Sequence, residues 1–449
     1  MQTNQNEFMQ KKLNKIIVLT ALLLAIVLKQ QAQEPLTLSG LIDRVLTENY
    51  QVKMVRNEAL QAANNNTLGN AGFLPSLDVQ GTTSRATNNT HQEMFNGTVR
   101  DGESAQSKVY SAYIEANWTI FDGFKMFAQR DKLSLLEQIG TIDARYFMEQ
   151  TIADVSVAYF QLVKEMALLD NLRKTCEVSR FRYRLEEKKR RVGSGTTLDY
   201  NLAIMDYHAD SLDMIGQEQM IKSLQIQLNR LSRTDPDMPL VPAEREFNPE
   251  GIATREMLTE QAVQANKEIR LAQIQELIAE KNVRIQQASR YPQIDTYGRY
   301  SYSNQTNEVG VTQLNRTYGR TFGLTIRFNL YNGGILNKAI ANEKLASENS
   351  VLTRQNTTEL ITAEVLDKYY EYQSLVKRQA LARENIQLAE KSQEIARMQF
   401  EKGAIDGYNF RQTQISVINA QNRLTQLGFS VKVLEIELNR LTGKLESLL

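Results

Sequence analysis

Side chains that often perform chemistry are scarce in this sequence. It holds two histidines, His91 and His208, and one cysteine, Cys176, too few for a Cys/His zinc site, a disulfide framework or a Cys-x-x-Cys redox motif. The acidic pair that opens residues 186–189 is followed by two lysines, a charge run more typical of a solvated helix face than of paired catalytic carboxylates. No Ser/His/Asp arrangement, phosphate-binding loop or metal cluster is recognisable. We therefore expect no enzyme activity, no cofactor and no metal site.

Composition and charge exclude further classes of protein. The 449 residues are 42% hydrophobic and 23% charged, which is typical of a folded chain rather than a disordered one. The 53 basic and 52 acidic side chains leave a formal net charge of +1. Because such a chain exerts no long-range attraction on polyanions, nucleic acid is not expected as a partner. Only 7 prolines are present, which permits very long helices.

Residues 1–32 are expected to form a secretory signal peptide. Lysines at 11, 12 and 15 precede an apolar run over residues 16–28, and Ala32 follows shortly afterwards. The run is shorter than the ~20 apolar residues that span a bilayer as a helix. A retained signal anchor is the alternative, and Met9 is an alternative start. The cleavage position is left open.

Beyond the N-terminus the sequence repeats itself at one fixed offset. The segment Leu-Asn-Arg-Leu-Ser at 228–232 recurs as Leu-Asn-Arg-Leu-Thr at 438–442, an offset of 210 residues. At the same offset Gly193 falls on Gly403, and residues 118–123 align with residues 328–333. Landmarks that share one offset without a gap indicate two copies of one structural module.

The prolines mark the boundaries of these copies. Four of them cluster within residues 236–249, and Pro75 and Pro292 stand at matching positions inside the two copies. We predict a first structural repeat over residues 33–233, a linker over residues 234–252, and a second repeat with a short C-terminal tail over residues 253–449.

Each repeat is predicted to run helix, β-hairpin, very long helix, turn, helix. In the first repeat residues 37–72 are expected to form the opening helix. After Pro75 the apolar period changes from the helical value to two, which is the signature of strands. The expected strands cover residues 77–84 and 110–121 in the first repeat and 294–302 and 322–330 in the second. Polar loops over residues 85–108 and 303–316 are expected to join each pair.

The helical period resumes after Gly123 and continues to about Arg191. Apolar residues there step by three and four, at positions 152, 155, 159, 162, 166 and 169, as in a coiled-coil seam. The return helices repeat this pattern in residues 221–231 and 431–441. A helix of about 68 residues is about 100 Å long. Packing along an extended tube or rod is therefore favoured over the alternative, a compact bundle.

The predicted strands are about ten residues long, the length of a tilted transmembrane β-strand. One chain supplies four strands, which cannot close, and an open sheet edge in lipid leaves backbone groups without hydrogen bonds. Three chains would supply twelve strands, within the usual range for outer-membrane barrels. The polar face, which carries Glu115, Asp295, Arg299 and Arg327, would then line a watery lumen. The alternative is a soluble hairpin domain at the end of a coiled-coil rod.

The chain resembles the TolC-type outer-membrane efflux protein family over nearly its whole mature length. The resemblance rests on the doubled plan, on Leu-Pro-Ser (74–76) and Tyr-Pro-Gln (291–293) before the strands, on Asp122-Gly123 and Asn332-Gly333 after them, and on the turn 191–199. It implies a mixed α and β fold. Two tandem repeats give four β-strands per chain of a shared trimeric 12-stranded transmembrane β-barrel, plus a long coiled-coil-like α-helical barrel.

The resemblance also implies a function without catalysis. It is that of a trimeric outer-membrane channel in a tripartite efflux or secretion system, which passes substrates from an inner-membrane transporter and a periplasmic adaptor protein to the exterior. The barrel would contact outer-membrane lipid and the helical part would lie in the periplasm. The alternatives are an exported coiled-coil structural protein without a membrane barrel and an autonomous periplasmic enzyme. The sequence does not indicate the cargo.

The resemblance places candidate functional residues at the helix turns. It implies adaptor docking at Val192, Gly193 and Gly403, and a gate or latch at Asp199, Asp406 and Asn409. The second repeat departs from the family pattern, because Lys402 replaces a Val and Asn409 stands where an Asp is common. Phe400 and Ile405 stand where a hydrogen-bonding Tyr and an Arg are expected. An acidic ring at position 409 is therefore excluded.

Overall fold

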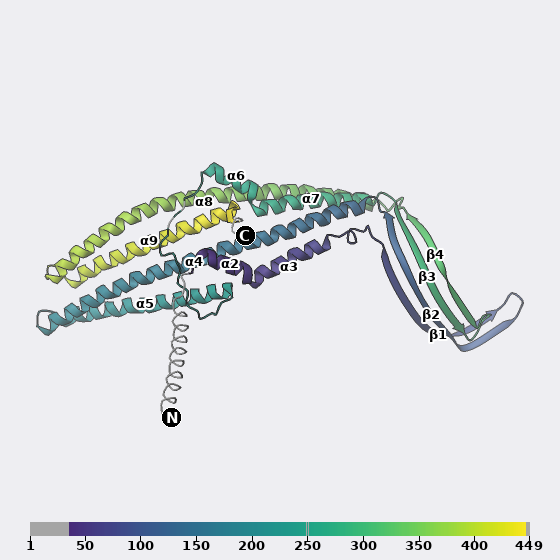
Figure 1. The fold of residues 1–449 in the computed structure, drawn as a ribbon, viewed down its shortest axis with the longest axis horizontal. Coiled ribbons are helices and arrows are strands. Elements are labelled where there is room, and N and C mark those ends of the chain that lie inside the picture. The colour runs from purple at the N-terminus through teal and green to yellow at the C-terminus, as the bar shows by residue number, and fades with distance from the viewer. Residues whose placement is uncertain (1–35, 248, 250, 446–449) are drawn as a thin grey trace, which may run out of the picture. The chain divides into compact units, whose positions relative to one another are not determined.

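The computed structural model describes residues 36–247, 249 and 251–445; the expected signal peptide lies outside these residues. The first repeat contains α2 (Leu38–Glu48), α3 (Tyr50–Asn65), β1 (Ser76–Glu93), β2 (Val99–Phe121), α4 (Lys125–Arg191) and α5 (Thr197–Ser232). The second contains α6 (Arg255–Ala265), α7 (Lys267–Ala288), β3 (Gln293–Asn307), β4 (Leu314–Arg327), α8 (Ile335–Glu401) and α9 (Gly407–Leu441) (Figure 1). The predicted order of hairpin, long helix, turn and helix is confirmed in both repeats, but two helices precede the hairpin in each.

The chain divides into two compact units that cut across the repeats. The helical unit contains the described residues up to Lys53 together with 147–262 and 363–445, and the sheet unit contains residues 54–146 and 263–362. Among the helices described here, none is both long and apolar enough to cross a bilayer. The proposed boundary of the linker, residues 234–252, stays a prediction.

The single opening helix predicted over residues 37–72 is wrong, because the chain breaks at Asn49. The Asn49 backbone is extended (φ −63°, ψ 131°), and its side-chain oxygen accepts hydrogen bonds from the N–H groups of Gln51 (2.9 Å) and Val52 (3.4 Å). Asn266 separates α6 from α7 in the same way, with φ −62° and ψ 129°. An asparagine that caps the following helix satisfies donors that would otherwise be unpaired, so each break is stabilised locally.

The four strands form one antiparallel sheet in the order β1-β2-β3-β4. They extend well beyond the predicted bounds, since β1 has 18 residues and β2 has 23, and the predicted loops shrink to residues 94–98 and 308–313. The many Asn, Thr and Ser residues of these segments predict loops. The segments form strands nevertheless, because the backbone hydrogen bonds of a sheet do not require an apolar face. At the other end β4 stops at Arg327, so Phe328 and Leu330 lie outside it.

Hydrogen bonds between side chains identify the polar face of the sheet. On this face Thr119 donates to the Asp295 carboxylate (2.8 Å), and Arg299 forms an ion pair with Glu115. The opposite face carries exposed apolar side chains, among them Trp118, Phe322 and Leu324. The predicted alternation of a polar and an apolar face is therefore confirmed.

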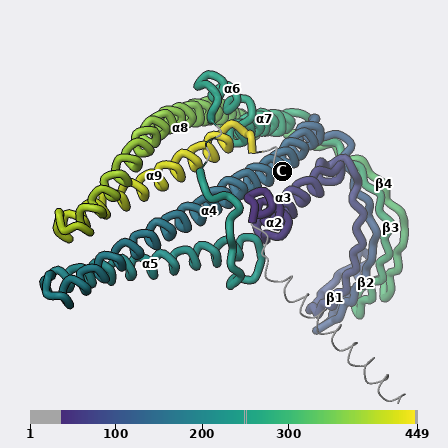
Figure 2. The backbone as a smooth tube through the Cα atoms, turned by 60° about the vertical axis from the view of Figure 1, so that its left-hand side comes forward, coloured from purple at the N-terminus to yellow at the C-terminus, as the bar shows by residue number. Residues whose placement is uncertain are grey.

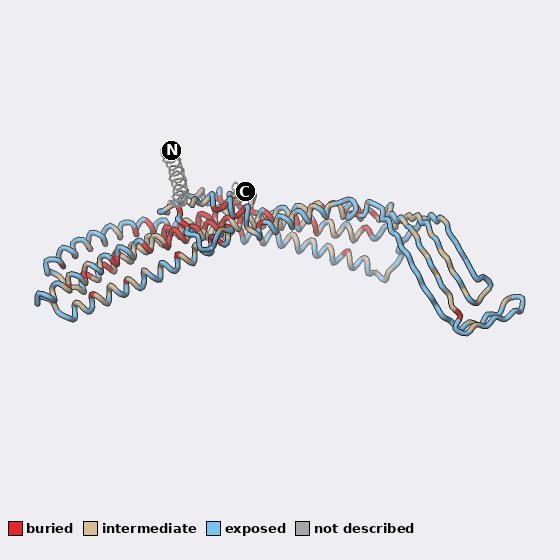
Figure 3. The backbone as a smooth tube through the Cα atoms, turned by 60° about the horizontal axis from the view of Figure 1, so that its bottom comes forward, coloured by how far each residue is buried: buried red, intermediate tan, exposed pale blue. Residues whose placement is uncertain are grey.

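The helical unit has a continuous apolar core. Its buried members include Ile152, Val155, Tyr159 and Leu162 of α4 and Leu228 of α5, as the seam pattern predicts. Buried positions cluster along the helices of this unit (Figure 3). Figure 2 shows α4 beside α5 and α8 beside α9. Hydrogen bonds join each pair, from the Gln217 amide to the Glu165 carbonyl oxygen (2.9 Å) and from the Tyr372 hydroxyl to the Glu435 carboxylate (3.2 Å).

Because of the Tyr372–Glu435 contact, the stability of the helical unit should decrease at alkaline pH. Burial of the ring and the adjacent Glu435 carboxylate raise the pKa of Tyr372 to about 12 from an ordinary value of 10.0. Because the folded state holds this proton more tightly than the unfolded state, the contribution is complete below pH 10 and is lost as the pH rises toward 12. Between pH 9 and pH 11.5 the free energy of unfolding of the wild type should therefore fall by about 2 kcal/mol more than that of Tyr372→Phe, which has no hydroxyl to titrate. Denaturant titrations of both proteins at about pH 9 and pH 11.5 check this, and equal losses would contradict it.

Candidate functional site at the helix turns

Glycines in the left-handed conformation end both long helices at their turns. Gly193 has φ 74° and Gly403 has φ 75°, a region that side chains with a Cβ rarely adopt. The N–H of Ser194 donates to the Lys189 carbonyl oxygen (2.9 Å), and the N–H of Ala404 donates to the Gln399 carbonyl oxygen (2.8 Å). These bonds close the last turn of each helix. The turns leave Val192 exposed; adaptor docking by Val192, Gly193 and Gly403 stays a prediction.

All three candidate latch residues take part in hydrogen bonds at helix N-termini, two through their side chains and one through its backbone. The Asp199 N–H donates to the Thr196 hydroxyl oxygen (3.0 Å), and that hydroxyl donates back to the Asp199 carboxylate (2.6 Å). In the second repeat Asp406 is the N-cap, and its carboxylate accepts from the Asn409 N–H (2.8 Å). Asn409 takes part through its backbone, which explains why an amide side chain is compatible with the fold there. A latch role for these residues stays a prediction.

The capping role of Asp406 can be measured directly. Asp406→Ala should lower the free energy of unfolding by about 1 kcal/mol, because the N–H of Asn409 loses its acceptor. Asp406→Ser keeps a good capping oxygen and should remain within a few tenths of a kcal/mol of the wild type. Thermal and denaturant unfolding of the three proteins provide the comparison. An equal loss in both variants would show that the carboxylate charge, and not the cap, is what stabilises the turn.

An aromatic pair replaces the polar contacts expected near position 400. Phe400 and Phe410 are fully buried and stacked, with ring centroids 5.0 Å apart and an angle of 5° between the rings. Ile405 packs against this cluster, and the Lys189 ammonium lies 4.3 Å from the Phe400 centroid. The departure of Phe400 and Ile405 from the family pattern therefore has a structural explanation, because both belong to an apolar core.

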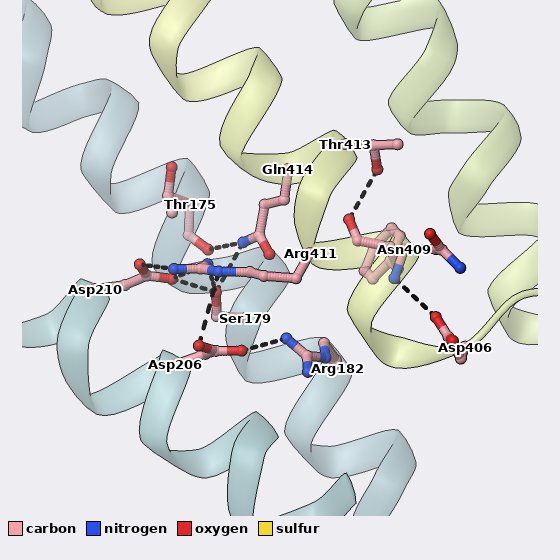
Figure 4. Close-up of polar contacts among 11 residues, drawn as sticks. Thr175, Ser179, Arg182, Asp206, Asp210, Asp406, Asn409, Arg411, Thr413 and Gln414 are labelled. Atoms are coloured by element: carbon pink, nitrogen blue, oxygen red, sulfur yellow. Dashed lines mark hydrogen bonds and ion pairs between the residues drawn. The ribbon is translucent and has the colours of Figure 1, made fainter.

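A largely buried polar cluster lies next to this pair and joins three helices (Figure 4). We call it the tip cluster; its members are Ser179 and Arg182 of α4, Asp206 and Asp210 of α5, and Arg411 and Gln414 of α9. Arg411 donates two parallel hydrogen bonds of 2.8 Å to the Asp210 carboxylate. Arg182 forms an ion pair with Asp206 at 2.5 Å. The Gln414 amide donates to the Ser179 hydroxyl oxygen (2.7 Å) and to the Thr175 carbonyl oxygen (3.2 Å).

The charges in the tip cluster balance, since two arginines face two aspartates. Burial works to lower the pKa of the Arg411 guanidinium, but the hydrogen bonds and charge of Asp210, with Asp206 nearby, raise it above its ordinary value. Arg411 therefore stays charged and bound. Burial, with the Asp210 charge, also raises the pKa of the neighbouring Cys176 thiol. This thiol is consequently a poor nucleophile near neutral pH.

A cavity of about 390 Å³ connects the tip cluster to two of the candidate latch residues; Asn409 does not line it. Asp199 and Asp406 line it together with Arg182, Asp206 and Arg411, and Leu202 and Tyr408 are among its other lining residues. The structure thus places Asp199 and Asp406, two residues predicted from the sequence, beside the tip cluster. The tip cluster itself was not predicted. The one available signal was the pair Asp206 and Asp210, four residues apart on one helix.

The sequence profile described as "Outer membrane efflux protein" matches residues 41–232 and 258–444 of the chain. The chain belongs to the outer membrane efflux protein family. The two matched segments coincide with the two repeats. No curated protein matches the chain in a sequence search.

Solved outer-membrane channels share the fold of this efflux-family chain. The CmeC outer membrane channel of Campylobacter jejuni superposes with a TM-score of 0.75 at 16% identity, covering 90% of this chain and 85% of that one. The outer membrane protein VceC of Vibrio cholerae gives 0.72 at 18% identity, with 90% and 96% covered. The open state of the MtrE outer membrane channel of Neisseria gonorrhoeae gives 0.71 at 15% identity, with 90% and 88% covered.

Family membership and fold confirm the main predictions. The efflux-family chain has the mixed α and β fold of trimeric TolC-type channels, with two repeats and four antiparallel strands. Proteins of this family are channels rather than enzymes, in agreement with the expected lack of catalysis. The family also places the chain in the outer membrane.

Proposed function

We propose that three copies of this chain form one outer-membrane conduit in a tripartite efflux or secretion system. The observation that carries the proposal is the four-stranded sheet, whose edge strands β1 and β4 each have a neighbour within the chain on one side alone. An apolar sheet face suits lipid, but free edges do not. Three sheets joined edge to edge give twelve strands and remove every free edge.

Exposed apolar stripes on two helices support self-association. Leu381, Leu388 and Ile395 of α8 are spaced by seven residues, and Leu198, Met205 and Leu212 of α5 repeat the spacing. All six side chains are more than half exposed. Seven-residue spacing is that of a helix–helix seam, so these stripes fit packing against helices of adjacent protomers.

Within this proposal the helices lie in the periplasm and the turns face the other components. An adaptor protein docks at the turns that contain Val192, Gly193 and Gly403, and an inner-membrane transporter supplies substrate and energy. The carboxylate residues Asp199 and Asp406 line a cavity beside these turns, which suits a role in closing the periplasmic end.

The gate can be tested by single-channel conductance in planar bilayers. Asp199→Ala should raise the conductance of the closed channel several-fold, because a carboxylate that holds the end closed is removed. Thr196→Ala is the matched control, since it removes the capping hydroxyl partner of Asp199 and retains the carboxylate. Equal conductance of Asp199→Ala and the wild type would exclude Asp199 from the latch. An equal increase in both variants would assign the effect to the cap.

The mass of the detergent-extracted particle tests the assembly. Native mass spectrometry should find three chains, and Leu388→Asp should reduce the trimer because it places a charge in the helix seam. Gln387→Asp, at the adjacent exposed position, should leave the trimer intact. A monomer that needs no detergent would instead favour an exported coiled-coil structural protein.

A further inference from the structure

The two faces of the sheet differ in the sign of their charges. Within the regularly paired stretches (76–87, 106–119, 293–307 and 314–327), cross-strand partners share a face. The polar face carries both signs: Asp78, Glu115 and Asp295 with Arg299 and Arg327. The apolar face in these stretches carries four cations, Arg85, Lys108, Arg316 and Arg320, and no Asp or Glu.

We call these four cations the outer cationic group. Arg316 lies near the end of β4 that is remote from the helices, Arg320 lies midway along β4, and Arg85 and Lys108 lie about midway along β1 and β2. Arg316 is ten residues from Ile326 along β4, and Lys108 is ten residues from Trp118 along β2. A strand tilted by about 40° rises about 2.5 Å per residue, so ten residues climb about 25 Å, the height of the lipid-facing band of a barrel. Arg316 and Lys108 therefore reach the edge of the hydrocarbon layer. Arg320 lies four residues lower, and its long side chain can extend upward.

Aromatic residues support this placement. Tyr110, Tyr302 and Tyr318 project from the same face of the sheet close to the cations. Tyrosine is typical of the boundary between lipid tails and headgroups. In the barrel proposed above, Arg85, Lys108 and Arg316 would thus lie in the headgroup layer on the side away from the helices, and Arg320 would lie below it.

In the part of the chain that the structure describes, no carboxylate forms an ion pair with this group. Arg85 and Lys108 stand directly opposite each other on β1 and β2, an arrangement that destabilises a sheet when both residues carry the same charge. The Arg85 guanidinium contacts the neutral Gln106 amide, and among the described residues none of the four cations forms an ion pair. All four side chains are exposed. An anion from outside the chain would remove the repulsion.

We propose that the outer cationic group binds the phosphate groups of lipid headgroups in the outer leaflet of the membrane. The proposal rests on the trimeric barrel proposed above. When that barrel closes, β4 of one protomer lies beside β1 of the next, which brings Arg316 and Arg320 near Arg85 and Lys108 of the neighbouring protomer. Phosphates bound there would connect adjacent protomers from the lipid side.

Native mass spectrometry of the detergent-solubilised full chain tests the proposal, with diphosphorylated lipid A as the probe. Each cation near an anionic headgroup contributes about fivefold to affinity, so Arg316→Gln with Arg320→Gln should weaken binding about 25-fold. The variant should fold, because removing charges from a lipid-facing surface is not destabilising. Arg327→Gln is the matched control, since it removes a cation from the same strand on the polar face.

The same spectra separate failure of this proposal from failure of the proposed function. Trimers that bind diphosphorylated lipid A, lose it in the double variant and keep it in Arg327→Gln would support the proposal. Three results obtained with intact trimers would overturn this proposal and leave the proposed function standing. They are an equal loss of binding in Arg327→Gln, no loss in the double variant, and equal binding of dephosphorylated lipid A. A particle of monomer mass would overturn both.

Discussion

Arg411→Met is expected to lower the free energy of unfolding of the helical unit by about 3–5 kcal/mol, the cost typical of leaving a buried charge without its partner. Arg411 forms two hydrogen bonds with Asp210, and the Asp210 carboxylate is almost completely buried. After the substitution the Ser179 hydroxyl alone would remain to bind that carboxylate within the tip cluster. Chemical denaturation of the detergent-solubilised protein measures the loss.

Two further variants show whether the loss comes from the buried charge. Adding Asp210→Asn to Arg411→Met should restore a large part of the stability, because no unpaired charge is then buried. Arg191→Met breaks an exposed pair with Glu187 on α4 and should cost less than about 1 kcal/mol. If the losses of Asp210→Asn and Arg411→Met simply add in the double variant, the two residues are not coupled and the interpretation is wrong.

Tyr159→Ala is expected to destabilise the helical unit by about 3–5 kcal/mol, because it removes a fully buried aromatic ring from the core. The Tyr159 hydroxyl contributes separately from the ring, through hydrogen bonds. It donates to the Leu36 carbonyl oxygen (2.8 Å), lies against the Glu244 carboxylate and accepts from the Ala243 N–H (3.2 Å). Tyr159→Phe should therefore cost about 0.5–1.5 kcal/mol on its own, the net contribution of a hydrogen bond, because the Ala243 N–H keeps the Leu36 carbonyl oxygen as its acceptor (2.9 Å).

The repeat supplies the matched control for this experiment. Tyr369 stands 210 residues after Tyr159 on α8 and is half-buried. Tyr369→Phe should change the free energy of unfolding by less than about 0.5 kcal/mol, the usual range for a substitution away from such contacts. Denaturant titrations of the three variants and the wild type give the comparison. A similar cost at both positions would show that the hydroxyl of Tyr159 has no special role in holding residues 36 and 243–244.

Sequence periodicity predicted the elements of this fold better than their ends. The seam positions Ile152 and Leu162 are buried as expected, because burial follows directly from a period that the sequence displays. The break at Asn49 was missed, since a capping asparagine changes a helix without interrupting its apolar pattern. The outer halves of β1 and β2 were missed because their side chains are polar on both faces, and pairing alone makes them strands.

The candidate site shows the same limit. The turn glycines Gly193 and Gly403 were found because a repeated glycine after a long helix is a local signal. The tip cluster was not found, because Arg411 and Asp210 are about 200 residues apart and belong to different repeats. A pair of that kind depends on how three helices pack, which no local pattern in the sequence records.

The division of the helical unit among three separate stretches of chain has a consequence for the order of folding. Its core contains Leu41 and Ile42 from the beginning of the described chain and Ile436 and Leu445 from its end. A chain that is synthesised from its N-terminus cannot complete this core until its last helix is available. Contacts between such distant residues form slowly, and unsatisfied apolar surface invites aggregation in the meantime. The apolar side chains near residues 41 and 152 therefore stay without their full set of core contacts until residues 436–445 are available, and this interval is the one in which the chain is most prone to aggregate.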